Sequence, residues 1–151
     1  MSKRHPELFL IDILMSIDSI KRNVKNLSFD HFVGDEKIFK STLQDLTVIG
    51  EAAKNLLETP SFLEGSSTEW RKIVDFRNVV VHKYFGIDYD FIYWITTKKI
   101  PVLEADIFNI MQQKKDKTLL LLAVETMKVE FTKLHRKDSL AYIDKIEKLI
   151  K

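Results

Sequence analysis

The sequence of 151 residues contains no cysteine, which excludes disulfide bonds, thiolate metal sites and a cysteine nucleophile. A chain without cysteine is compatible with a reducing cytoplasm, and we expect it to act there. The N-terminus lacks a signal-peptide pattern, and no apolar run approaches the length of a membrane span. We therefore expect no membrane partner.

Glycine and proline are scarce, with four and three residues respectively. So few turn-forming residues favour long helices over many short strands. Hydrophobic residues make up 45% of the chain, which is enough for one buried core. The sequence therefore predicts a single all-α domain.

The net charge of +2 is close to neutral, but it is unevenly distributed. From Lys114 to Lys151 the sequence has ten Lys or Arg residues and six Asp or Glu residues. This basic part either helps to hold a polyanion or forms a solvated helix surface. Charge alone does not distinguish these two uses.

Apolar residues at spacings of three and four predict amphipathic helices in the first half of the chain. The first begins at Pro6 and ends near Lys25. The second runs from about Asp35 to Glu58, with Gly50 in its middle. Because a mid-helix glycine costs roughly 1 kcal/mol relative to alanine, we expect Gly50 to let another helix approach closely.

A third helix is predicted after a polar loop, capped by Ser67 or Thr68. It contains Trp70 and an apolar run through Val81, and Gly86 ends it. The three consecutive valines in this run would also suit a strand. The cap, the length of the segment and the helical neighbours favour a helix.

The second half of the chain is also predicted to be helical. Asp88 caps a fourth helix, which Pro101 interrupts. Further helices follow at 102–111, at 118–134 and from Asp138 or Ser139 onward. The polar stretch 112–117 indicates a boundary.

Four polar residues of different kinds interrupt the apolar run of the third helix: Arg77, Asn78, His82 and Tyr84. They form either a buried hydrogen-bond network or a site, because buried polar groups need partners. On an ideal helix Arg77 and His82 lie about 140° apart around the axis. One straight helix does not bring them together without the reach of the Arg side chain, a distortion, or a second copy of the helix.

The chemistry of these residues suits a phosphodiester. Arg offers a rigid fork of donors for phosphate oxygens, and His exchanges protons near neutral pH. RNA supplies its own nucleophile, so a metal-free ribonuclease needs a base, an acid and a stabiliser of the developing charge. Asn78 would orient His82 or bind the substrate. Glu51, beside Gly50, either belongs to such a site or lies at a surface or interface.

Metal and cofactor chemistry are not indicated by the sequence. None of the four histidines has a ligand partner at helical spacing, and no glycine-rich phosphate loop is present. We therefore expect no metal and no cofactor.

The segment 77–84, Arg-Asn-Val-Val-Val-His-Lys-Tyr, resembles the Arg-Asn-x-x-x-His-x-Tyr motif of HEPN-domain proteins of the HepT toxin type. The segment 49–54, Trp70, the segment 84–88 and Ile100-Pro101 fall in the order and spacing of that family. The resemblance covers roughly His5 to Lys115. It implies a HEPN-type antiparallel bundle of four to five core helices over residues 1–115, followed by a C-terminal helical extension, 116–151, packed on the same domain.

The resemblance also implies an activity. Many such proteins are metal-independent endoribonucleases that act as homodimers, with a cleft built from both subunits. Arg77 and His82 correspond to the catalytic pair, and we expect Asn78 and Glu51 to shape the site. A composite cleft would resolve the awkward spacing of Arg77 and His82. The extension serves as a dimer element, an RNA-holding surface, an antitoxin-binding surface or simply as packing.

Regulation is implied as well. HepT-type toxins are paired with an MNT-type nucleotidyltransferase antitoxin, which can transfer AMP to the motif tyrosine, here Tyr84. The added bulk and negative charge would repel RNA from the cleft. The alternative is a non-catalytic HEPN binding module that partners a nucleotidyltransferase and leaves RNA intact.

Overall fold

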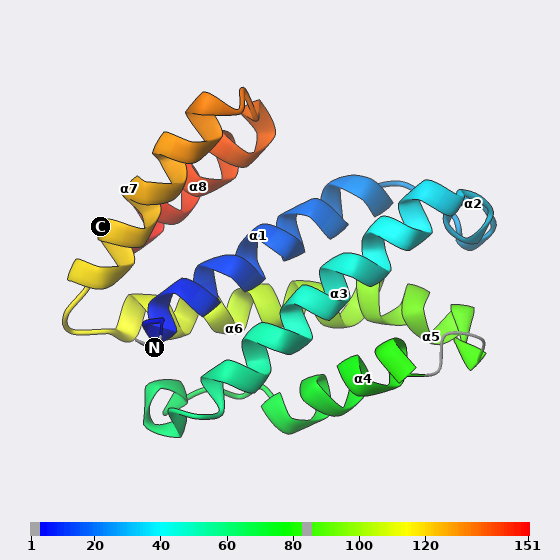
Figure 1. Ribbon diagram of the computed structural model, residues 1–151, viewed down its shortest axis with the longest axis horizontal. Helices are drawn as coiled ribbons and strands as arrows, with labels where there is room; N and C mark the ends of the chain where they lie inside the picture. Colours follow the sequence, from blue (N-terminus) through cyan, green and yellow to red (C-terminus); the bar gives the residue numbers. More distant parts are fainter. Residues whose placement is uncertain (1–3, 83–85) are drawn as a thin grey trace.

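A computed structural model describes residues 4–82 and 86–151, except for the side chains of Val81 and His82. Every regular element within these ranges is helical, as expected, and Figure 1 shows their arrangement. The elements are α1 (Pro6–Val24), α2 (Phe29–Gly34), α3 (Glu36–Leu56), η1 (Pro60–Leu63), α4 (Trp70–His82), α5 (Tyr89–Trp94), η3 (Ile95–Lys99), α6 (Ile100–Gln113), α7 (Thr118–Lys133) and α8 (Lys137–Ile150).

The long helices of the first part run in alternating directions and form an antiparallel bundle (Figure 1). Helix α3 packs against α1 on one side and against α4 on the other, and α6 also contacts α1. The core between them is apolar and includes Leu10, Leu14, Ile17, Phe32, Leu46, Leu56 and Ile107. Among the described helices, none is long and apolar enough to cross a membrane. The predicted all-α bundle is confirmed.

Side chains cap the starts of two helices, one at the predicted cap Asp88 and one at Asp35, which was predicted as the approximate start of a helix. The Asp35 carboxylate accepts a hydrogen bond of 3.0 Å from the backbone N–H of Ile38 at the start of α3. At the start of α5, the Asp88 carboxylate accepts one of 3.2 Å from Phe91. Each cap satisfies a backbone donor that the first helical turn leaves without a partner.

The predicted break at Pro101 is wrong. Helices α5 and α6 are joined by η3, a π-helical turn, so that helix continues from Tyr89 to Gln113. The N–H of Ile100 bonds to the carbonyl of Ile95, five residues earlier. Pro101 follows this wider turn in the first turn of α6, where a proline is tolerated because its missing N–H is not required.

Two predicted caps are also absent. The hydroxyls of Ser67 and Thr68 donate to Asp106 on α6 instead of accepting from the start of α4. Helix α8 begins at Lys137, and no side-chain cap precedes it. The chain leaves α7 with His135 at a φ of 57°, and α8 begins directly after Arg136, so the predicted caps Asp138 and Ser139 lie inside the helix.

Helices α7 and α8 form a C-terminal hairpin that packs on α1 and α6, away from α4 (Figure 1). A buried polar network ties the hairpin to the bundle. Glu104 of α6 accepts hydrogen bonds of 2.7 Å from Lys21 of α1 and from the hydroxyl of Tyr142 of α8. Burial and the neighbouring Glu104 carboxylate raise the pKa of Tyr142, so its hydroxyl keeps its proton and donates. The domain boundary at 115 stays a prediction.

We predict that Tyr142→Phe lowers the free energy of unfolding by about 1–3 kcal/mol, because a buried carboxylate oxygen loses its donor. Urea denaturation would measure the change. Tyr89→Phe is the matched control, since Tyr89 is exposed and its ring contact with Phe39 survives the substitution. Equal stabilities of the two variants would contradict a structural role for the Tyr142 hydroxyl.

Candidate functional site

Helix α4 is fixed at its start by Asp106, which projects from α6. The carboxylate accepts hydrogen bonds from the hydroxyls of Ser66, Ser67 and Thr68 and from the backbone N–H of Ser67. Burial alone would raise the pKa of Asp106, but these hydrogen bonds together lower it. The loop that leads into α4 is therefore held against α6 by an ionised carboxylate.

The middle of α4 is fixed by a close contact with α3 at Gly50. A Cβ atom added to Gly50 would collide with Cβ and Cγ of Arg77 and would lie 3.4 Å from its Cα. The aliphatic stem of Arg77 therefore lies directly on the backbone of α3. The predicted packing role of Gly50 is confirmed.

Both terminal nitrogens of the Arg77 guanidinium have side-chain partners. Nη2 forms an ion pair with Glu51 of α3, and Nη1 donates a hydrogen bond of 2.9 Å to Oδ1 of Asn78. The third nitrogen, Nε, is buried without a hydrogen-bond partner. The Arg77 side chain is 20% exposed and that of Glu51 43%. The guanidinium is therefore held from two sides at the edge of the α3–α4 contact, within reach of solvent.

The sequence-predicted site residues are only partly brought together. Arg77, Asn78 and Glu51 form one contact cluster. His82 ends α4, five residues after Arg77, but its side chain lies outside the described part of the chain. Tyr84 lies outside the described residues altogether.

An exposed apolar surface is formed by residues of α4 and α5. Val79 of α4 is 45% exposed, and Phe91 and Trp94 of α5 are each 44% exposed. Phe76 and Phe91 meet edge to face at 5.7 Å, and Phe91 stacks on Trp94 at 5.8 Å. A small apolar cavity of about 290 Å³ lies under this surface, between α4 and α5. The ring contacts make Phe76, Phe91 and Trp94 a contiguous patch, which is the kind of apolar surface that marks an interface.

Some of these features were not predicted from the sequence. Asp106 follows the segment that it fixes by about forty residues, and no local pattern indicates that contact. In the described ranges, no cluster of three or more His, Asp or Glu side chains could hold a metal ion. The aromatic surface of α5 could have been found from the sequence, because Phe91 and Trp94 are three residues apart and therefore lie on one face of the helix.

The family model described as "Ribonuclease HepT-like" matches residues 13–110. Among curated proteins, one from Caldanaerobacter subterraneus, named as a putative RNase, is 35% identical over 73% of this chain and 97% of its own length. A Methanocaldococcus jannaschii protein, also named as a putative RNase, is 36% identical over 77% of this chain and 93% of its own.

A Thermococcus cleftensis protein named "Probable ribonuclease HepT" is 32% identical over 68% of this chain and 93% of its own length. No solved structure matches the chain significantly. The family match ends at residue 110, so α7 and α8 lie beyond it.

We predict that Gly50→Ala destabilises the protein by about 1–3 kcal/mol, because α3 and α4 must separate to admit the methyl group. Chemical denaturation would measure the loss. Gly34→Ala is the matched control, since a Cβ at Gly34 meets nothing within 4 Å. If both variants unfold at the same urea concentration, the close approach at Arg77 is not what Gly50 provides.

Proposed function

Because this chain belongs to the HepT-like ribonuclease family, we propose that it is a metal-independent endoribonuclease with Arg77 and His82 as its catalytic pair. The observation that carries the proposal is the fixed guanidinium of Arg77. It is held at the α3–α4 contact, on the same helix as His82 and partly open to solvent. A preorganised cation is what a phosphodiester cleavage site needs.

The proposed reaction uses the 2′-hydroxyl of RNA as the nucleophile. His82 removes the proton from this hydroxyl, and its oxygen attacks the adjacent phosphorus. The bond from phosphorus to the 5′-oxygen breaks, and a second His82, from the other subunit, returns a proton to that oxygen. Arg77 stabilises the negative charge that develops on the phosphate oxygens. The products are a 2′,3′-cyclic phosphate and a 5′-hydroxyl end.

Glu51 and Asn78 are proposed to shape the site by holding Arg77. A free Arg side chain samples many rotamers, and ordering it on substrate binding costs free energy. The ion pair with Glu51 and the hydrogen bond to Asn78 meet this cost during folding. The donors of Arg77 that remain free would then face the phosphate.

A homodimer is proposed because five residues separate Arg77 from His82 on α4. A second copy of α4 would bring the Arg77 of one subunit towards the His82 of the other. The exposed Val79 on α4, with Phe91 and Trp94 on the adjoining α5, supports this arrangement, since a second subunit that packs on α4 would cover them.

We further propose that the chain is the toxin of a toxin–antitoxin pair. A nucleotidyltransferase antitoxin of the MNT type would transfer AMP to the hydroxyl of Tyr84, two residues after His82. The adduct would add bulk and a negative charge near the cleft, and both exclude a polyanion.

The ribonuclease mechanism predicts that Arg77→Ala and His82→Ala each reduce RNA cleavage by about a hundredfold or more, with EDTA present throughout. Gel analysis of total RNA would follow the reaction. Arg71→Ala and His31→Ala are controls, because both side chains are exposed and lie apart from the cluster. If EDTA abolishes cleavage by the wild-type protein, the proposed metal-independent mechanism is wrong. Wild-type protein that leaves RNA intact would favour a non-catalytic binding module.

The regulatory proposal predicts that protein produced together with an MNT-type nucleotidyltransferase antitoxin carries one AMP on Tyr84 and does not cleave RNA. Peptide mass spectrometry would locate the adduct. Tyr84→Phe should escape modification and keep its activity, because its ring is retained and only the acceptor hydroxyl is lost. Modification at another residue, or an adduct that leaves cleavage unchanged, would refute this form of control.

A further inference from the structure

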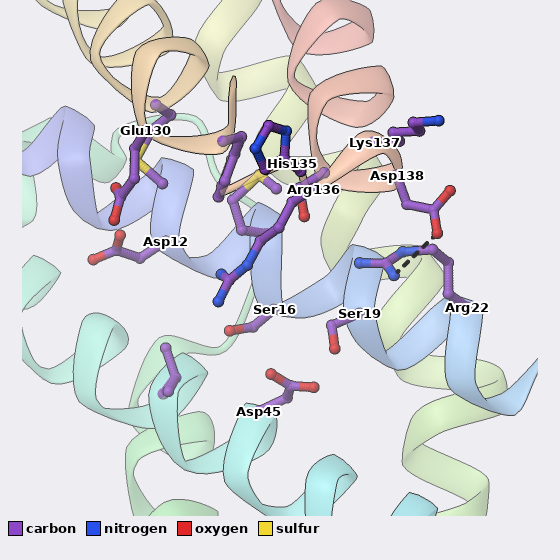
Figure 2. Close-up of a pocket in the computed structure, with 15 residues that line it drawn as sticks. Asp12, Ser16, Ser19, Arg22, Asp45, Glu130, His135, Arg136, Lys137 and Asp138 are labelled. Carbon is purple, nitrogen blue, oxygen red and sulfur yellow. Dashed lines mark ion pairs between the residues drawn. The ribbon is translucent and has the colours of Figure 1, made fainter. Parts of the chain in front are cut away.

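A second cavity lies away from the arginine cluster, where the C-terminal hairpin meets the bundle. This hairpin groove has a volume of about 770 Å³, which is within the usual range for ligand sites. Its floor is formed by residues of α1 and α3, and its roof by the end of α7 and the turn into α8 (Figure 2). It is lined by Asp12, Met15, Ser16, Asp45, Phe131 and Arg136, among others.

The groove exists only because this chain carries the hairpin. The family match covers the floor from residue 13 onward but ends before α7. The curated relatives are matched over almost their whole length by about three quarters of this chain. The groove is therefore a feature added to the family bundle, and its role does not rest on the proposed ribonuclease activity.

Charges of opposite sign face one another across the groove. Asp45 rises from α3 with its carboxylate directed toward Ser16 and Ser19, and Arg136 extends from the turn toward Ser16 (Figure 2). Oδ2 of Asp45 is buried without a hydrogen-bond partner. In the described ranges, no hydrogen bond or ion pair involves the Arg136 guanidinium.

Three of the neighbouring charged side chains are already paired within the chain. Asp12 pairs with Arg4 at 2.7 Å. Arg22 pairs with Asp18 at 2.9 Å and with Asp138 at 3.7 Å. Asp45, whose Oδ2 is buried without a partner, and Arg136 face the groove and would both gain from a partner of opposite charge.

The burial of the Asp45 carboxylate favours a cationic partner. Burial raises the pKa of Asp45 to about 6, although a hydrogen bond with Ser19 and the charge of Arg22 act in the opposite direction. A cation bound to the carboxylate would offset the cost of burial. Met15, Val48 and Phe131 provide an apolar wall beside it, which suits the aliphatic stem of an Arg or Lys side chain.

We propose that the hairpin groove binds a segment of a partner protein in which a basic side chain adjoins an acidic one. The basic group pairs with Asp45 and the acidic group pairs with Arg136. The groove is lined by acidic Asp45 and Glu130 as well as by basic Arg136 and Lys137, and RNA, which carries only negative charge, would leave the acidic side chains without a partner. A polypeptide that carries both charges pairs with Asp45 and with Arg136 at the same time.

The test uses the full chain and a capped tetrapeptide, acetyl-Ala-Arg-Glu-Ala-amide, at neutral pH. Amide chemical shifts in NMR spectra would report binding. We expect saturable shifts at Asp45, Ser19 and Arg136. Replacing the peptide's arginine by citrulline, which is neutral and similar in shape, should weaken binding at least about tenfold, because the charge-assisted pair is lost.

Two variants test the two walls of the groove. Asp45→Asn removes a buried charge and is expected to fold, but to bind the tetrapeptide at least about tenfold more weakly. Arg136→Gln should weaken binding of this peptide and not of one with glutamine in place of glutamate. Glu125→Gln is the control, since Glu125 is exposed on α7 and outside the groove.

Several outcomes would overturn the proposal. These are no shifts at the groove, equal binding of the citrulline peptide, or unchanged binding by Asp45→Asn. A short RNA oligonucleotide that produces the same shifts would assign the groove to a polyanion. If Arg136→Gln alters the titration of Asp45 without peptide, the two side chains pair with each other, and the hairpin closes on the bundle instead of on a partner.

Discussion

The contact between α3 and α4 at Gly50 is the constraint on which the arginine cluster depends. Because Gly50 has no side chain, the stem of Arg77 lies on the α3 backbone. That placement brings the guanidinium to Glu51, the next residue of α3. A larger residue at position 50 would separate the helices and carry the charged group away from its partner. The packing of α3 on α4 therefore also determines the geometry of the arginine cluster.

The same helix is held independently at its start. Asp106 receives hydrogen bonds from three consecutive residues of the loop before α4. This second point fixes the direction of α4, whereas the Gly50 contact fixes its distance from α3. Two such points, one polar and one steric, leave Arg77 little freedom to move relative to the bundle. A cation that acts on a developing charge benefits from this rigidity, since no reorganisation is then needed.

The sequence predicted the elements whose causes are local. Spacing of apolar residues predicted the long helices, and the cost of a mid-helix glycine predicted the close approach at Gly50. It failed where the cause lies far along the chain. The hydroxyls of Ser67 and Thr68 look like helix caps until Asp106, almost forty residues later, is placed beside them. Pro101 looks like a break because a π turn that precedes a proline has no recognisable local pattern.

The candidate site was predictable to a similar degree. The sequence predicted that Glu51 lies next to the helix contact, because it follows Gly50. Its ion pair with Arg77 could not be predicted without the packing of α3 on α4. The roles of His82 and Tyr84 still depend on the motif, because their side chains lie outside the described part of the chain. The hairpin groove was not predictable, since its charged residues come from α1, α3 and the α7–α8 turn.

The two sites differ in how their charges are satisfied, and this difference argues for different ligands. At Arg77 the cation is fixed by acceptors of the same chain, yet it keeps donors for an anion that arrives later. In the groove, Asp45 and Arg136 come from opposite walls, and Oδ2 of Asp45 is buried without a hydrogen-bond partner. The first arrangement suits a reacting polyanion, for which a cation must be in place beforehand. The second suits a ligand that carries both charges, because either charge alone would leave one wall without a partner.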